Sequence, residues 1–114
     1  MGRLYYGNMP EPIEMPDRIL AHLKVVISTK LRRSESFPLT WHRGDDDAER
    51  STIWLHCSIP MRFDVSSEAC ASLDRAYLNE LAKAANSSGG LVVDLREADD
   101  AAPTGPRRSL VRAA

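Results

Sequence analysis

The stretch "SFPLTWHRGDDDAERSTIWLHCSIPMRFDV", residues 36–65, decides the fold. Apolar residues alternate with polar ones in three places: in 37–42, in 51–57 and in 61–65. Alternation with a period of two is typical of half-buried strands. The polar run 43–50 and the segment "SIP" at 58–60 supply the turns between them. The stretch therefore predicts three consecutive strands, paired as an antiparallel meander.

Two amphipathic helices flank this stretch. Pro16 and Asp17 suit the start of a helix over 16–33, and Ser72 suits the N-cap of a second helix that Gly89 and Gly90 end. Apolar positions recur in both with the helical period. They are Ile19, Leu20, Leu23, Val26, Ile27 and Leu31 in the first helix, and Leu73, Tyr77, Leu81, Ala84 and Ala85 in the second.

Short strands complete the pattern. Residues 3–6, "RLYY", read as a strand, and 10–14 read as an edge segment that folds back beside it, because Pro10 and Pro12 exclude a central position. Residues 91–95, "LVVDL", are apolar enough for a central strand. Since each helix must lay its apolar face on the sheet, the order predicts a two-layer α+β fold. It has a mostly antiparallel sheet of four to five strands with two helices on one face.

Length and composition predict one domain with a tail. The chain has 114 residues, which suits a single α+β domain over 1–97 and a flexible C-terminal tail over 98–114. No run approaches the roughly 20 apolar residues of a membrane helix, and the start lacks the apolar core of a signal peptide. We therefore expect a cytoplasmic protein with no membrane partner. The net charge of −1 gives no overall attraction to nucleic acid.

Two cysteines and one strand raise the question of nucleophilic chemistry. Successive side chains of a strand point to opposite faces, so His56 and Cys57 point apart and cannot form a Cys–His pair. Cys57 shares its face with Ile53 and Leu55, which predicts a buried thiol in the core. With Cys70 it is expected to be a free thiol, since an intracellular chain rarely forms disulfides.

The opposite face of the same strand is a candidate ligand surface. Trp54 and His56 share that face, and His42 lies on the partner strand across the loop, beside Trp41. Aromatic and histidine side chains gathered on one sheet face can bind a ligand. The alternative is that the tryptophans are ordinary strand residues that fill the core or cover the sheet.

No motif predicts a metal or a cofactor. The three histidines, His22, His42 and His56, lack the spacing of a zinc site. The acidic run 45–47 with Glu49 lacks the spaced ligands of a calcium loop, so we interpret it as a solvated turn.

The first helix carries a basic side. Cations gather on residues 16–33, opposite the apolar face: Arg18, Arg32 and Arg33 lie in one sector with His22 and Thr29 between them, and Lys24 and Lys30 add further charge. Such a side can bind phosphates or an acidic protein partner. The alternative is a solvated face, with cations placed favourably at the C-terminal end of the helix dipole.

Four segments carry a resemblance to a known family. They are "MGRLYYGN", "DRILAHLKVVISTKLRRSESF", "RSTIWLHCSIPMRF" and "LNELAKAANSSGGL". In their order along the chain and in their residues they resemble a family of short actinobacterial proteins of undefined activity, and the resemblance covers about residues 1–95. Its members often carry the name "ATP-dependent DNA ligase", and the resemblance implies an association with DNA ligation. Similar proteins often have proline where Cys57 stands, so the resemblance implies no thiol chemistry.

The ligase name implies a nucleophilic lysine that this chain does not show. An ATP-dependent DNA ligase uses the lysine of a KxDG motif, whereas the lysines here begin "KVVI" at Lys24, "KLRR" at Lys30 and "KAAN" at Lys83. A P-loop motif is absent as well. No catalytic residue of the family can be transferred to this chain.

Three functions remain open. The first is a non-catalytic binding module, with a protein partner or a homodimer formed through the sheet face that the helices leave uncovered. The second is a DNA-associated accessory factor that uses the basic helix. The third is an enzyme whose residues meet only in three dimensions, drawn from the three histidines, the acidic loop and Lys24.

Overall fold

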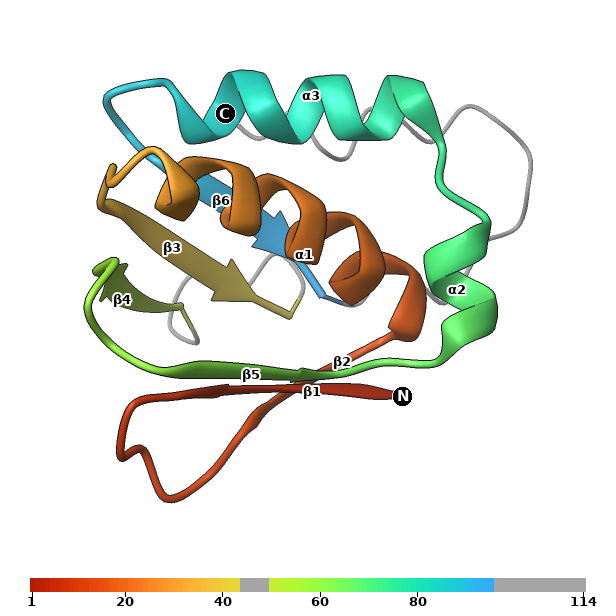
Figure 1. Ribbon diagram of the computed structural model, residues 1–114, viewed down its shortest axis with the longest axis horizontal. Helices are drawn as coiled ribbons and strands as arrows, with labels where there is room; N and C mark the ends of the chain where they lie inside the picture. Colours follow the sequence, from red (N-terminus) through yellow and green to blue (C-terminus); the bar gives the residue numbers. More distant parts are fainter. Residues whose placement is uncertain (44–49, 96–114) are drawn as a thin grey trace.

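The computed structural model describes residues 1–43 and 50–95 of the chain, and within these ranges it forms six strands and three helices (Figure 1). In order they are β1 (Gly2–Tyr6), β2 (Ile13–Met15), α1 (Asp17–Arg32), β3 (Phe37–His42), β4 (Ser51–Leu55), β5 (Met61–Asp64), α2 (Ser67–Ala71), α3 (Arg75–Ala85) and β6 (Leu91–Asp94). The predicted acidic loop and the predicted tail at 98–114 lie outside the described residues.

The strands divide between two sheets. In the described residues, sheet A has the order β2-β1-β5 and sheet B the order β4-β3-β6. Every pairing is antiparallel except that of β3 with β6, which is parallel, with Leu39 opposite Leu91. The α+β class is confirmed, as is the return of the chain after β1 to pair beside it.

The prediction of one sheet with a continuous meander is wrong. β3 and β4 pair as expected, but β5 pairs with β1, placing Phe63 opposite Leu4. Alternation marks the buried face of a strand and says nothing of its partner. β6 is an edge strand and not a central one, because α3 contributes to the burial of Leu91 and Val93 in place of a further strand.

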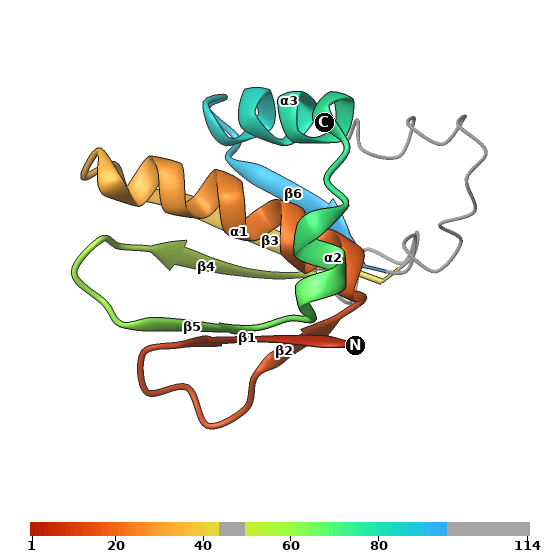
Figure 2. The same ribbon diagram turned by 45° about the vertical axis from the view of Figure 1, so that its right-hand side comes forward.

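α1 packs into the angle between the sheets. Figures 1 and 2 show sheet B behind α1, sheet A below it and α3 above it. This arrangement buries Leu20, Leu23 and Ile27 completely. Leu20 faces sheet A, since a side chain added at Gly2 would lie 2.7 Å from Leu20 Cδ2. Among the described residues no helix has the length and apolarity needed to cross a membrane.

The second helical region is two helices and not one. Ser66 accepts a hydrogen bond from the Ala69 N–H and caps the short α2. Asp74, rather than the predicted Ser72, caps α3 by accepting from the backbone N–H groups of Ala76 and Tyr77 at 2.9 and 3.4 Å. Two capping residues eight positions apart allow the chain to turn between two helices.

A glycine fixes the entry into β6. Gly90 has a φ of +80°, and a Cβ there would lie 2.6 Å from the Pro38 carbonyl oxygen. Only glycine allows both this backbone conformation and this close approach to β3.

Candidate functional site

Contacts within the domain occupy two of the five predicted basic residues of α1. Arg18 forms an ion pair with Asp74 at 3.4 Å and lies over the ring of Tyr77, 4.7 Å from its centroid. Lys30 donates to Asn86 at 2.8 Å and pairs with Glu35 at 3.1 Å. These contacts hold α1 against α3 and the turn that follows α1. Arg18 and Lys30 therefore contribute to packing before they contribute to any ligand.

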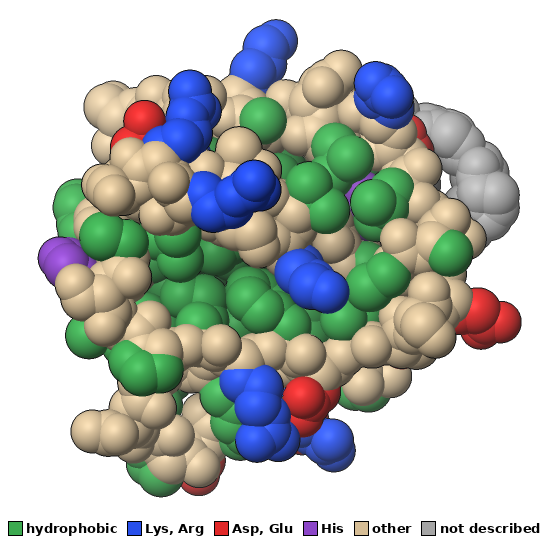
Figure 3. Space-filling view, in the orientation of Figure 1, with side chains coloured by type: hydrophobic (Ala, Val, Ile, Leu, Met, Phe, Trp, Pro, Cys, Tyr) green, Lys and Arg blue, Asp and Glu red, His purple; other side chains and the backbone are tan. Residues whose placement is uncertain are grey.

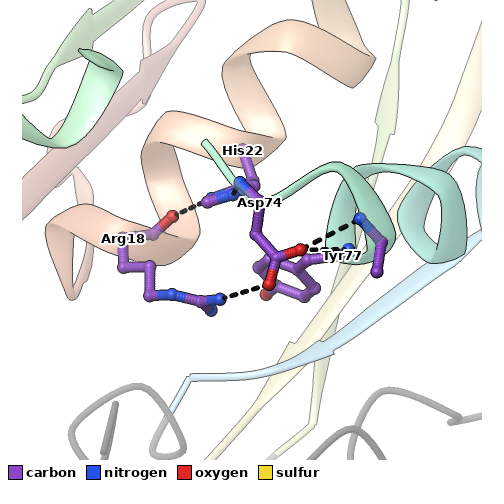
Figure 4. Close-up of polar contacts among 5 residues, drawn as sticks. Arg18, His22, Asp74 and Tyr77 are labelled. Atoms are coloured by element: carbon purple, nitrogen blue, oxygen red, sulfur yellow. Dashed lines mark hydrogen bonds and ion pairs between the residues drawn. The ribbon is translucent and has the colours of Figure 1, made fainter. Parts of the chain in front are cut away.

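His22 lies between α1 and α3, and its prediction as part of the exposed basic side is wrong. The side chain is fully buried. Figure 4 shows the imidazole ring between the Arg18 carbonyl and the segment that starts α3, with Tyr77 beside them. The ring centroids of His22 and Tyr77 are 4.7 Å apart. Because α3 covers this side of α1, the helix has two buried faces where the sequence predicts one.

The hydrogen bonds of His22 define its protonation state. Nε2 accepts the backbone N–H of Asp74 at 2.8 Å, so Nδ1 carries the proton and donates to the Arg18 carbonyl at 2.7 Å. Burial of the ring lowers the pKa of His22 below its ordinary value of 6.5, although the bond to the Arg18 carbonyl opposes the shift. A neutral ring with both nitrogens satisfied is a structural bridge between helices.

The remaining basic residues of α1 face solvent. Lys24, Arg32 and Arg33 are exposed, and none of them has an ion-pair partner within the described part of the chain. Lys24 follows Leu20 by one helical turn, so it stands at the edge of the side that faces sheet A. Arg32 and Arg33 lie at the C-terminal end of α1. The predicted basic side is thus reduced to three available cations.

The predicted sheet-face residues are separated by the register of sheet B. Trp54 lies opposite Pro38 and is 60% exposed, while His42 lies opposite Asp94 on the far side of β3. The outer face between them is occupied by Thr40 and Thr52, whose hydroxyls are 2.7 Å apart. Trp41 points to the opposite face and packs partly buried against the core. These side chains form no compact cluster.

His56 and Cys57 lie beyond the end of β4. The strand ends at Leu55, and the chain then turns, with His56 Nδ1 accepting the backbone N–H of Ser58 at 3.0 Å. Cys57 is exposed, so the prediction of a core thiol is wrong. The alternation that placed it in the core stops two residues earlier. Cys70 is a half-buried free thiol, as expected.

An apolar hollow lies between α1 and β5. Figure 3 shows hydrophobic side chains in a depression between α1 and β5, with lysine and arginine side chains on both sides of it. Ile53 of β4 and Met61 and Phe63 of β5 are partly buried side chains of these elements that pack against the core. We call the depression between α1 and β5 the apolar hollow; Met61 and Phe63 belong to the strand beside it.

A second depression lies at the other side of β3. It has a volume of about 600 Å³ and lies between Trp41, Arg43 and the segment 9–14. Arg43 donates to the Glu14 carbonyl at 2.8 Å, which holds this segment in place. Its lining includes none of the histidines and lysines that the enzyme hypothesis uses. The described residues also contain no cluster of three or more metal-ligating side chains.

Tyr6 joins the two sheets, a role that the sequence does not signal. Its hydroxyl donates to the Trp54 carbonyl at 2.8 Å and accepts the His56 N–H at 2.9 Å. Tyr6 thus links the end of β1 in sheet A to the end of β4 in sheet B. The pattern "YY" indicates a strand, but it gives no sign that one hydroxyl binds a distant strand edge.

Comparison with known proteins gives one match. A family model described as a domain of unknown function (DUF7882) matches residues 1–96. No curated protein and no solved structure matches the chain.

Proposed function

This chain belongs to the DUF7882 family of domains, and we propose that it acts as a non-catalytic interaction module that binds a protein partner in the cytoplasm. The observation that carries the proposal is the apolar hollow. Side chains of this kind, left partly exposed between a helix and a strand edge, are common at surfaces that bind other proteins. Lys24, exposed on α1, adds a positive charge that can favour an acidic partner.

A pair of surface variants tests this proposal. Met61→Glu places a charge in the apolar hollow, whereas Trp54→Glu places the same charge on the outer face of sheet B. The domain is crosslinked to its partners in cell extract. We expect the crosslinked complexes to disappear with Met61→Glu and to remain with Trp54→Glu. Circular dichroism checks that both variants fold. Products that persist with Met61→Glu and disappear with Trp54→Glu would move the binding surface to the outer face. Sedimentation of the purified domain shows whether a product is the homodimer.

A DNA-associated role, linked to the ligation that the family resemblance implies, is the second candidate. Its support is the exposure of Lys24, Arg32 and Arg33 on one helix. Three cations predict weak binding that salt disrupts. Fluorescence anisotropy with labelled single- and double-stranded DNA at about 50 mM salt, repeated at higher salt, measures it. The triple glutamate variant of these residues should abolish binding, and Lys83→Glu on α3 serves as the control. Flat traces at low salt would remove this candidate.

A further inference from the structure

The apolar hollow is bordered by two strand edges that face each other. β4 is an outer strand of sheet B and β5 is an outer strand of sheet A, and no ladder joins them in the described residues. They are consecutive in the chain, connected by residues 56–60, and run side by side in Figure 2. An outer strand presents unpaired backbone groups that can receive another strand.

The hydrogen bonds show which backbone groups point into the gap. On β4 the Trp54 carbonyl points away from β3, since it accepts from Tyr6. The alternation of backbone groups in antiparallel strands then directs those of Thr52 the same way. On β5 the Pro60 carbonyl accepts the Gly7 N–H, so the groups of Arg62 face β1. Those of Met61 and Phe63 therefore face β4.

Tyr6 limits the space that a strand can use. Its hydroxyl already satisfies the Trp54 carbonyl and the His56 N–H at the end where the connection closes the gap. Thr52 and Phe63 lie at the other end of the gap, away from this connection. A bound segment would therefore pair over a short length there.

The side chains around the gap indicate which kind of peptide segment would bind there. Side chains of an added strand would alternate between the apolar hollow and the solvent. Lys24, exposed and without an ion-pair partner in the described residues, stands on the side of α1 that faces sheet A. Arg62 of β5 does not add to this charge, because its guanidinium pairs with Asp64 and lies over the ring of Tyr5. Lys24 alone thus complements negative charge on the segment.

From these observations we propose that an extended segment of a partner protein binds as an additional strand between β4 and β5. The segment alternates apolar and polar residues and carries acidic flanks. This inference rests on the proposed function, because it assigns the binding mode and the partner chemistry of the same hollow. Backbone hydrogen bonds supply the attachment, and alternate side chains supply the selectivity.

The test uses a synthetic peptide in place of the unidentified partner. The probe is an acetylated nonapeptide of alternating valine and threonine with two glutamates at each end. A matched peptide carries N-methyl groups on its valines, which removes backbone donors while keeping the side chains. Titration of the whole chain is followed by the amide resonances in NMR. We expect saturable shifts at Thr52, Met61 and Phe63, and affinity at least about tenfold lower for the methylated peptide.

A surface variant tests the charge. Lys24→Glu replaces an exposed side chain, so the fold should persist, and it should weaken the glutamate-flanked peptide but not a glutamine-flanked one. Equal affinity of the methylated and unmethylated peptides overturns strand addition, while the proposed function still stands on its own variants. Shifts that avoid β4 and β5, or no binding at about 1 mM peptide, overturn it too. The proposed function itself fails if the wild-type chain gives no crosslinked product, or if both Met61→Glu and Trp54→Glu retain every product.

Discussion

The backbone N–H of Asp74 donates to Nε2 of His22 at 2.8 Å, across 52 positions of sequence. This bond joins the second turn of α1 to the start of α3. Protonation of the ring would turn Nε2 into a donor, and two donors would then face each other in a buried site. The bridge between the helices therefore exists only while His22 is neutral.

Stability should fall in mildly acidic solution because of this bridge. The pKa of His22 is lowered by burial in the folded chain and is about 6.5 in the unfolded chain, so the unfolded state binds the proton first. The contribution of His22 is fully present above pH 6.5 and declines as the pH falls toward the lower folded pKa. Urea unfolding at pH 7.5, 6.5 and 5.5 measures it.

His22→Gln provides the comparison. It should lower the free energy of unfolding at pH 7.5 by about 1–3 kcal/mol, since buried partners lose their hydrogen bonds. The difference between wild type and variant should shrink as the pH falls. A difference that stays constant over this range would show that another group causes the acid sensitivity.

The cap of α3 can be separated from the ion pair. Asp74→Ala removes the side-chain acceptor for Ala76 and Tyr77 and should destabilise the domain by about 1 kcal/mol. Asp74→Asn keeps an acceptor oxygen and removes the charge that Arg18 meets, so it should cost less than about half of that. Thermal unfolding of both variants gives the comparison. Equal losses would assign the effect to the ion pair.

Two adjacent glycines should differ widely in their tolerance of alanine. Gly90→Ala forces a Cβ to within 2.6 Å of the Pro38 carbonyl at a φ of +80°, and should cost about 3 kcal/mol or more. Gly89→Ala meets no atom within 4 Å and should change stability by less than about 0.5 kcal/mol. Denaturation in urea measures both. A tolerated Gly90→Ala would mean that β6 can enter the sheet along another path.

The bridge made by Tyr6 is a fourth measurable feature. Tyr6→Phe removes the hydroxyl that binds the Trp54 carbonyl and the His56 N–H, and should destabilise by about 0.5–1.5 kcal/mol. Tyr5→Phe, which keeps its ring beneath Arg62, serves as the control. Amide exchange at His56 should accelerate only in Tyr6→Phe. Unchanged exchange there would show that water replaces the hydroxyl without loss.

The periodicity of the sequence predicts the helices and strands better than it predicts which strands pair with each other. The alternation of Phe37, Leu39 and Trp41 identified β3, and the helical period identified α1. Neither pattern contains the pairing of β5 with β1, because a strand of the same alternation fits either neighbour. The split into two sheets therefore could not be predicted from these residues.

The candidate site was predicted less well for a related reason. A helical projection places His22 with Arg18 and Thr29, but it cannot show that α3 covers part of that side. Cys57 followed the alternation of β4, which ends at Leu55. The apolar hollow depends on where two separate sheets diverge, so no local run of sequence signals it. The exposure of three cations could be predicted, because the helical period of α1 places them away from its apolar face. They are Lys24, Arg32 and Arg33.

The way in which the strands are divided between the two sheets has a consequence for folding during synthesis. Sheet A needs β5 to complete β1 and β2, and sheet B needs β6 to complete β3 and β4. On the ribosome, β1 has no partner on one side until residues 61–64 emerge, although proteins otherwise fold from the N-terminus onward. Sheet B remains incomplete until residues 91–94 follow. Sheet A can therefore be completed before sheet B, and the N-terminal strands stay accessible to chaperones and proteases until these later strands emerge.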